Sequence, residues 1–214
     1  MKKGLSKVLV FVVLSAMMMA VSPVFAQDSN VFQEKLEKVR ALVDEVEVLK
    51  ELDDPAWNPK VYEAFNELKR LYVQDRTSPD LYLLFAKCYW YNDRPEKAKG
   101  SLRKALYFDS HHVESLILKG DIISGEIKKQ IGEEWYEPFG DKHQAKKAYE
   151  TALGVEGLDV DTQSLINLKL GNMYEVLNLK RKARYYWQKA YEIAPKSQAG
   201  GIAHGKLYTS EEDF

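Results

Sequence analysis

Side chains capable of acid–base or metal chemistry are few in this sequence and lie far apart. The four histidines are His111, His112, His143 and His204. None has a second histidine four residues away with an acidic neighbour, the spacing that places metal ligands on one helix face. The sequence also lacks a G-x-S-x-G elbow and a Gly-rich phosphate loop. We therefore predict no catalytic residues, no metal and no cofactor, and we expect that the chain is not an enzyme.

A carboxylate cluster is the one arrangement that could carry out hydrolysis. Glu133, Glu134 and Glu137 surround the pair Trp135 and Tyr136, and paired carboxylates beside aromatic rings are typical of glycoside cleavage. The same composition also describes a solvated loop pinned by two rings. We favour the loop, because no motif around these residues supplies a catalytic scaffold, and we keep a glycan hydrolase using Glu133 and Glu137 as a minor alternative.

The single cysteine, Cys88, is not expected to be reactive. It lies among Phe85, Ala86 and Tyr89 on an apolar helix face, which favours a small buried side chain over a nucleophilic thiol. One cysteine allows no intrachain disulfide, so the fold must be held together by apolar burial.

The N-terminal residues have the pattern of a secretory signal. Lys2, Lys3 and Lys7 precede an apolar run over 8–21, and Ala26 provides a small residue for cleavage. A membrane anchor is the alternative, but the run is short for a spanning helix and Ser22 and a proline interrupt it. We expect residues 1–26 to be a signal peptide and the protein to be exported, to the periplasm or as a secreted protein.

Removal of residues 1–26 would leave 188 residues with a formal charge of −4, because three lysines are lost. This length suits a single domain with a substantial core. A mildly acidic chain has no electrostatic reason to bind nucleic acid or anionic lipid. We expect neither partner, and no stable membrane insertion after signal removal.

A spacing of small and bulky residues occurs three times in the remaining chain. A small residue is followed by Ala after twelve positions, by a bulky apolar residue four positions later and by Ala after three more. The copies are Ala86, Ala98, Leu102, Ala105; Gly120, Ala145, Tyr149, Ala152; and Gly171, Ala183, Trp187, Ala190. In the second copy thirteen extra residues separate the first two members. Two antiparallel helices approach closely only where facing side chains are small, so the spacing predicts stacked helical hairpins.

These residues resemble the tetratricopeptide repeat (TPR) family, whose 34-residue unit has the pattern W-x₂-L-G-x₂-Y, then A-x₃-F, then P. The third copy is the most similar, and it has Leu170, Gly171, Tyr174, Ala183 and, at its end, a proline in register. Asp93 and Asn178 stand in the hairpin turns, where both residue types tolerate the left-handed conformation. The resemblance implies an all-α fold, a right-handed superhelical α-solenoid of antiparallel hairpins.

The expected organisation follows these repeats along the chain. After the signal peptide we expect a divergent helical hairpin, three TPR-like repeats and a flexible tail. Their ranges are 27–78 for the hairpin, 79–112, 113–163 with an insertion near 124–142, 164–197, and 198–214 for the tail. The apolar residues of 31–52 recur at steps of four and three, which also fits a short coiled coil, but packing within the array is favoured. The tail lacks a long apolar face, so no capping helix is evident, and the exposed side of the last hairpin is covered by the tail, by a second copy or by a partner, or is left bare by a flexible tail.

The family resemblance also implies where a ligand binds. In TPR arrays the first helix of each hairpin lines a groove, and its second, fifth, ninth, twelfth and thirteenth positions face the ligand. The corresponding residues here are Leu83, Lys87, Trp90, Tyr91, Ile117, Asp121, Ser124, Leu168, Asn172 and Glu175. Trp90 and Tyr91 are either aromatic anchors for the ligand or packing residues. Trp135, Tyr136 and Phe139 mark the insertion as a second surface, which either binds a partner or folds back.

The sequence therefore favours an exported scaffold that holds a partner protein or peptide along the groove, with an extended or helical apolar segment as its ligand. A self-associating structural subunit of the cell envelope is the alternative, using the uncovered last hairpin or the N-terminal helix.

Overall fold

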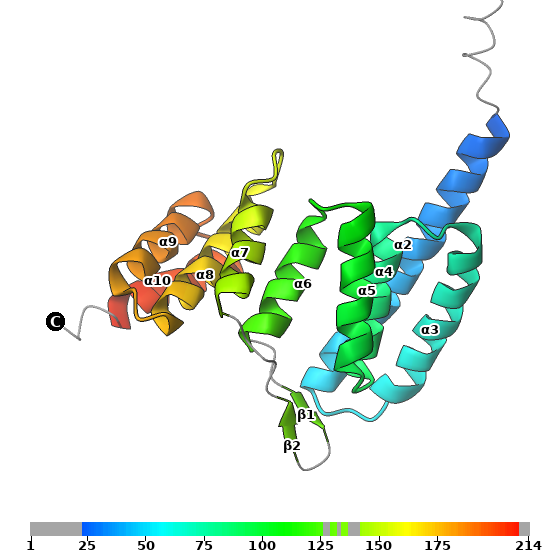
Figure 1. Ribbon diagram of the computed structural model, residues 1–214, viewed down its shortest axis with the longest axis horizontal. Helices are drawn as coiled ribbons and strands as arrows, with labels where there is room; N and C mark the ends of the chain where they lie inside the picture. Colours follow the sequence, from blue (N-terminus) through cyan, green and yellow to red (C-terminus); the bar gives the residue numbers. More distant parts are fainter. Residues whose placement is uncertain (1–22, 126–128, 132–133, 137–141, 210–214) are drawn as a thin grey trace, which may run out of the picture.

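The computed structural model describes residues 23–125, 129–131, 134–136 and 142–209. Almost all of these residues are helical (Figure 1). The helices are α2 (Pro23–Glu51), α3 (Trp57–Gln74), α4 (Pro79–Tyr91), α5 (Pro95–Phe108), α6 (Val113–Ser124), α7 (Lys142–Leu153), α8 (Val160–Val176), α9 (Lys180–Ile193) and α10 (Gln198–Thr209). The fold is a stack of antiparallel helical hairpins, as predicted.

Three hairpin turns contain a residue in the same left-handed backbone conformation. Asp53, Asp93 and Asn178 have φ values of 56°, 53° and 57°, each at the end of the first helix of a hairpin. Only Gly, Asn and Asp adopt this left-handed conformation at low cost. The prediction for Asp93 and Asn178 is confirmed, and Asp53 shows that the divergent hairpin α2–α3 turns in the same way.

The recurring small residues lie where helices come closest. A Cβ atom added to Gly120 would lie 2.3 Å from Cε1 of Tyr149, and one added to Gly171 would lie 2.2 Å from Cδ1 of Trp187. Ala86 and Ala98 are fully buried in the first repeat. The predicted spacing therefore reflects helix packing, since each glycine leaves room for one large ring from the following helix.

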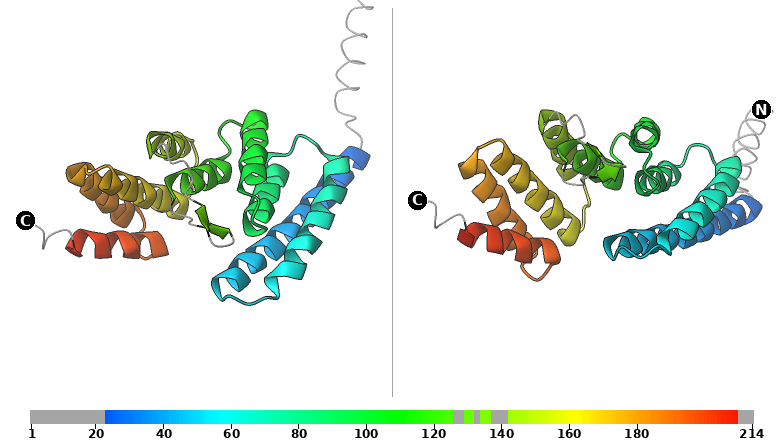
Figure 2. Two further views of the ribbon diagram at one scale, coloured as in Figure 1. Left: turned by 60° about the horizontal axis from the view of Figure 1, so that its bottom comes forward. Right: turned by 90° about the horizontal axis from the view of Figure 1, so that it is seen from below.

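The core is divided into three clusters of buried side chains that follow one another along the stack. The first joins α2, α3 and α4, the second joins α4, α5 and α6, and the third extends from α6 to α10. Figure 2 shows the resulting arch, with the α2–α3 hairpin at one end and α10 at the other. Helix α6 contributes to two clusters and so connects the two halves of the arch.

The insertion between α6 and α7 contains two short antiparallel strands rather than loop alone. Strand β1 (Lys129–Ile131) pairs with β2 (Glu134–Tyr136), with Lys129 opposite Tyr136. This hairpin projects from the lower edge of the stack in Figure 1. Trp135 and Tyr136 belong to β2, whereas Phe139, Glu133 and Glu137 lie outside the described residues.

The expectation of a flexible tail over 198–214 is wrong for most of its length, because residues 198–209 form α10. Ala199 and Ala203 are buried in the third cluster, and His204 stacks on Tyr191 with 4.4 Å between ring centroids. A Cβ added to Gly200 would lie 2.0 Å from the carbonyl oxygen of Ala194. The glycine that made this segment look unstructured is what lets α10 dock closely enough to cover the last hairpin.

The N-terminal helix begins earlier than the predicted start at residue 31, since α2 starts at Pro23. Most of the predicted signal segment lies outside the described residues, and its proposed end at Ala26 falls within α2. None of the helices in the described part of the chain is both long enough and apolar enough to cross a membrane.

Candidate protein-binding surfaces

The predicted groove residues divide into two groups in the structure. Leu83, Trp90, Asp121 and Leu168 are buried. The remaining residues are partly or fully exposed: Lys87, Tyr91, Ile117, Ser124, Asn172 and Glu175. The sequence pattern therefore did not separate packing residues from accessible ones.

The buried group belongs to the stack itself. Leu83 and Trp90 of α4 lie in the second cluster together with Leu118 and Ile122 of α6. Leu168 of α8 lies in the third cluster. Trp90 is therefore a packing residue that joins the first repeat to the next, and it is not exposed as an anchor for a ligand.

Lys87 is engaged by the N-terminal helix. Its Nζ lies 3.3 Å from Oδ1 of Asp44 and 3.7 Å from Oε2 of Glu47, both on α2. Tyr91, one helical turn further along α4, has its pKa raised by burial and by the Glu47 carboxylate beside it. Helix α2 thus runs along α4 and adds acidic groups to the surface that the repeat helices were predicted to form alone.

Arg40 of α2 connects three helices. Its guanidinium donates to Oδ1 of Asp80 at the start of α4 and to Oε2 of Glu114 at the start of α6, each at 2.6 Å. His112 places Nε2 3.4 Å from Oδ1 of Asp80. The hydrogen bond with His112 and the charge of Arg40 hold the pKa of Asp80 below its usual value, although burial acts in the opposite direction. Sequence reasoning missed Arg40, because α2 carries no recognisable repeat motif.

A buried polar group also connects three helices further along the stack. Oδ1 of Asp121 accepts a hydrogen bond from the Tyr149 hydroxyl at 2.7 Å and lies 2.7 Å from Nζ of Lys169. These side chains come from α6, α7 and α8. Charge pairs of this kind are stable only when their geometry is good and their partners are complete, so this group fixes the three helices relative to one another.

Helix α10 contacts the exposed residues of α8 at the C-terminal end of the stack. Nζ of Lys206 lies 2.8 Å from Oε2 of Glu175 on α8, and Nε1 of Trp187 donates to Oδ1 of Asn172 at 3.1 Å. We call eight partly or fully exposed residues of α2, α4, α6 and α8 the inner wall. Its members are Arg40, Asp44, Glu47, Lys87, Tyr91, Ile117, Asn172 and Glu175.

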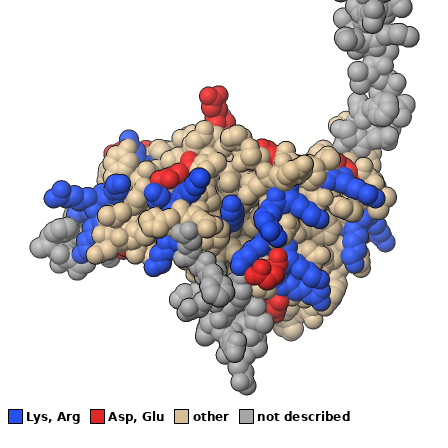
Figure 3. Space-filling model, in the orientation of Figure 1, with Lys and Arg blue, Asp and Glu red and all other residues tan. Residues whose placement is uncertain are grey.

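The second helices of the three repeats carry a different charge. Helices α5, α7 and α9 together contain twelve Lys and Arg residues and three Glu residues, whereas α4, α6 and α8 contain three Lys and five acidic residues. Figure 3 shows lysines and arginines spread across the side on which α5, α7 and α9 lie. We call the exposed side chains of these three helices the outer face. The small net charge of the chain conceals this separation.

Each acidic residue of the outer helices already has a nearby cation on its own helix. Glu96 pairs with Lys99, Glu150 with Lys146, and Glu192 with Lys189. Seven cations of the outer face have no carboxylate partner within the described residues: Lys97, Arg103, Lys104, Lys142, Lys147, Arg181 and Lys182. Among the described residues, the positive charge is therefore in excess on this face.

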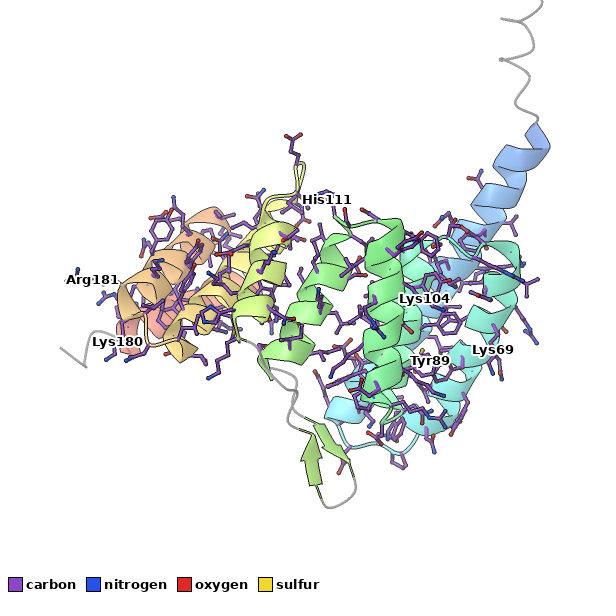
Figure 4. All side chains as sticks on the ribbon, viewed as in Figure 1. Lys69, Tyr89, Lys104, His111, Lys180 and Arg181 are labelled. Carbon is purple, nitrogen blue, oxygen red and sulfur yellow. The ribbon has the colours of Figure 1, made fainter. Side chains whose placement is uncertain are left out.

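Aromatic rings accompany these cations in two repeats. Lys97 lies over the ring of Tyr89 at 5.7 Å, and Lys182 lies over Tyr174 at 5.3 Å, the equivalent position of the third repeat. Lys104 lies over Tyr82 at 5.4 Å. Figure 4 shows Tyr89 and Lys104 facing the viewer on the same side of the stack. Each such contact contributes about 0.5–1 kcal/mol at an exposed site.

The described residues contain no group of three His, Cys, Asp or Glu side chains arranged to hold a metal ion. The inner wall presents charged, polar and apolar side chains, and the outer face presents basic and aromatic side chains.

Comparisons with known proteins agree with the repeat architecture. Residues 79–112 match the family model for the tetratricopeptide repeat, and these residues comprise α4 and α5. The structure of Pseudomonas aeruginosa PilF is similar to this chain with a TM-score of 0.61 and 16% identity, covering 84% of this chain and 72% of PilF. PilW, a widely conserved type IV pilus biogenesis factor, gives a TM-score of 0.52 and 14% identity, covering 81% and 78%. No curated protein matches the sequence. At these identities the likeness shows the fold alone, which is that of a TPR-like α-solenoid.

Proposed function

We propose that this tetratricopeptide-repeat chain is a protein-binding scaffold that holds a peptide segment of a partner against the inner wall. The observation that carries the proposal is the fixed placement of the wall by ion pairs. Arg40 connects α2, α4 and α6, and Asp121 connects α6, α7 and α8. A surface that is already ordered loses little entropy when it binds, so more of the contact energy appears as affinity.

The chemistry of the wall selects the type of ligand. Tyr91 and Ile117 are partly exposed and provide apolar contact area, while Asp44 and Glu47 of α2 remain about half exposed beside Lys87. We therefore propose a ligand segment with an apolar anchor residue followed or preceded by basic residues. The aromatic ring of Tyr91 supplies contact area with little ordering cost.

The test is site-specific photo-crosslinking in intact cells. A photoreactive amino acid placed at Tyr91 or Ile117 should give a discrete crosslinked species, whereas the same amino acid at Tyr107 of the outer face should not give that species. Mass spectrometry of the adduct identifies the partner and the crosslinked segment. Equal crosslinking from all three positions, or none from the inner wall, would contradict the proposal.

Two further features remain proposals at this stage. The insertion, with Trp135, Tyr136 and Phe139, is proposed as an additional contact surface, and deletion of residues 129–136 should weaken partner binding while helix content is retained.

We also propose export to the periplasm, on the basis of the basic and apolar N-terminal pattern. Cell fractionation followed by N-terminal sequencing tests this, and a mature chain beginning at Gln27 is the expected result.

The alternative of self-assembly through the last hairpin has lost the feature that favoured it. That route depended on an uncovered final hairpin, and α10 packs on α8 and α9 and buries Ala199 and Ala203 there. Self-association through the N-terminal helix stays a prediction, and the scaffold is the leading proposed function.

A further inference from the structure

The excess positive charge of the outer face is not used by the proposed scaffold function, which depends on the inner wall. We propose that the outer face docks the folded chain onto the surface of an anionic lipid bilayer. The chain would then lie on the membrane through α5, α7 and α9 without inserting a helix. This revises the sequence-based expectation that the chain has no electrostatic reason to seek anionic lipid.

The first argument is the distribution of charge. Arg103, Lys147 and Arg181 are exposed, lie on three different helices, and have no carboxylate partner within the described residues. Figure 3 shows positive side chains over the breadth of this side, with no single dense cluster. A broad distribution suits a planar anionic surface, since many weak headgroup contacts act together.

The second argument is the pairing of cations with exposed rings. Tyr107 of α5 is 82% exposed and Tyr185 of α9 is 57% exposed, and both stand among lysines and arginines. Tyrosine combines an apolar ring with a polar hydroxyl and is enriched at membrane–water interfaces. Phe108, next to Tyr107, is 40% exposed. Rings at this position can enter the headgroup region while the cations contact phosphates.

A soluble acidic polypeptide is the competing ligand for a basic surface. The rings favour the bilayer, because a charge-only contact with an acidic chain gives no role to exposed Tyr107 and Tyr185. Lys97, Lys104 and Lys182 support the same choice, since each is exposed while it lies over the ring of a buried or half-buried tyrosine.

The test measures sedimentation of the full chain with vesicles. Phosphatidylglycerol diluted in phosphatidylcholine is compared with pure phosphatidylcholine, at low and high salt. Three variants are compared with the unaltered chain. The first combines Arg103→Glu, Lys147→Glu and Arg181→Glu. The second combines Lys35→Glu, Lys38→Glu and Lys196→Glu, which change the net charge equally but lie outside the outer face. The third combines Tyr107→Ser and Tyr185→Ser.

We expect salt-sensitive binding that requires phosphatidylglycerol. Each basic group near an anionic surface contributes about fivefold in affinity, so the outer-face triple variant should bind at least about 100-fold more weakly, while the second triple variant loses much less. Because all variants keep the same N-terminal apolar run, any contribution of that run is equal in each. The tyrosine variant should bind vesicles several-fold more weakly yet bind soluble poly-glutamate as the unaltered chain does.

Three outcomes would overturn the proposal. The first is equal loss of binding in the two triple variants, since net charge alone would then explain it. The second is binding that does not depend on phosphatidylglycerol. The third is a tyrosine variant with unchanged vesicle binding together with equally tight binding of poly-glutamate, which would assign the face to an acidic polypeptide. Crosslinking from Tyr91 is measured separately, so a failure here does not affect the scaffold proposal.

Discussion

Lys169 of α8 and Asp121 of α6 form an ion pair of 2.7 Å, and their side chains are only 13% and 12% exposed. The Tyr149 hydroxyl donates to the same carboxylate oxygen at 2.7 Å. This pair joins the second and third repeats, which are also linked by the Tyr174 hydroxyl donating to Oε1 of Glu150 at 3.1 Å. Its removal tests how strongly the stack depends on the buried charge pair.

Replacing Asp121 with Ala removes the acceptor shared by Lys169 and Tyr149 and leaves a buried ammonium group without that charge. Loss of one partner of a buried pair costs about 3–5 kcal/mol. Tyr149→Phe keeps the ion pair and should cost only about 0.5–1.5 kcal/mol, the usual net value of one hydrogen bond. Urea unfolding followed by circular dichroism measures both, and equal losses in the two variants would contradict a dominant role for the ion pair.

Two adjacent glycines in α10 give a matched comparison. Gly200→Ala places a methyl group 2.0 Å from the Ala194 carbonyl oxygen, whereas Gly201→Ala meets nothing within 4 Å. We expect the first substitution to destabilise the fold by about 1–3 kcal/mol through overpacking. The second should stabilise it by about 0.5–1 kcal/mol, since alanine is the better helix former. Thermal unfolding midpoints measure both, and changes of the same sign would argue against close docking of α10.

The Asp80 carboxylate predicts a pH dependence of stability. Because its pKa is lower in the folded chain than in the unfolded chain, where it is about 3.9, ionised Asp80 stabilises the fold fully above about pH 4. That contribution is lost as the pH falls through the lowered folded pKa. Thermal midpoints of the unaltered chain should therefore decrease more steeply below pH 4 than those of Asp80→Asn. Parallel curves would show that the contacts with His112 and Arg40 do not act on stability.

Cys88 provides a probe of the N-terminal core. Its side chain is buried in the first cluster, and burial raises the pKa of its thiol to about 12. Because the thiolate is the reactive form, a thiol reagent at pH 8 should label the native chain extremely slowly and the urea-unfolded chain rapidly. Rapid labelling of the native chain would mean that the α2–α3 hairpin opens readily from α4. Labelling is followed by the absorbance of the released chromophore.

The packing of the stack could be read from sequence because it depends on local spacing. Gly171 and Trp187 are sixteen residues apart in one hairpin, and the fit between them fixes both positions. The left-handed turns at Asp93 and Asn178 were predictable for the same reason, because their residue types restrict the backbone. Such features recur from one repeat to the next and depend only on residues that are close in the sequence.

Helix α10 and the burial of the groove residues could not be predicted in this way. The segment holding Gly200 and Gly201 has low helix propensity, and its helix depends on docking against α8 and α9. Trp90 is buried because α6 lies across it, and Lys87 is paired because α2 follows α4. Each outcome depends on a contact between distant segments that the family pattern does not encode.

The excess of cations on α5, α7 and α9 over the nearly balanced charge of α4, α6 and α8 makes the folded chain electrically asymmetric. A molecule of this kind does not approach a charged plane in random orientations, because the field turns it before contact is made. Approach by α5, α7 and α9 would leave the side bearing Tyr91 directed toward the aqueous phase. One charge pattern would thus control orientation at the membrane and access for a second protein.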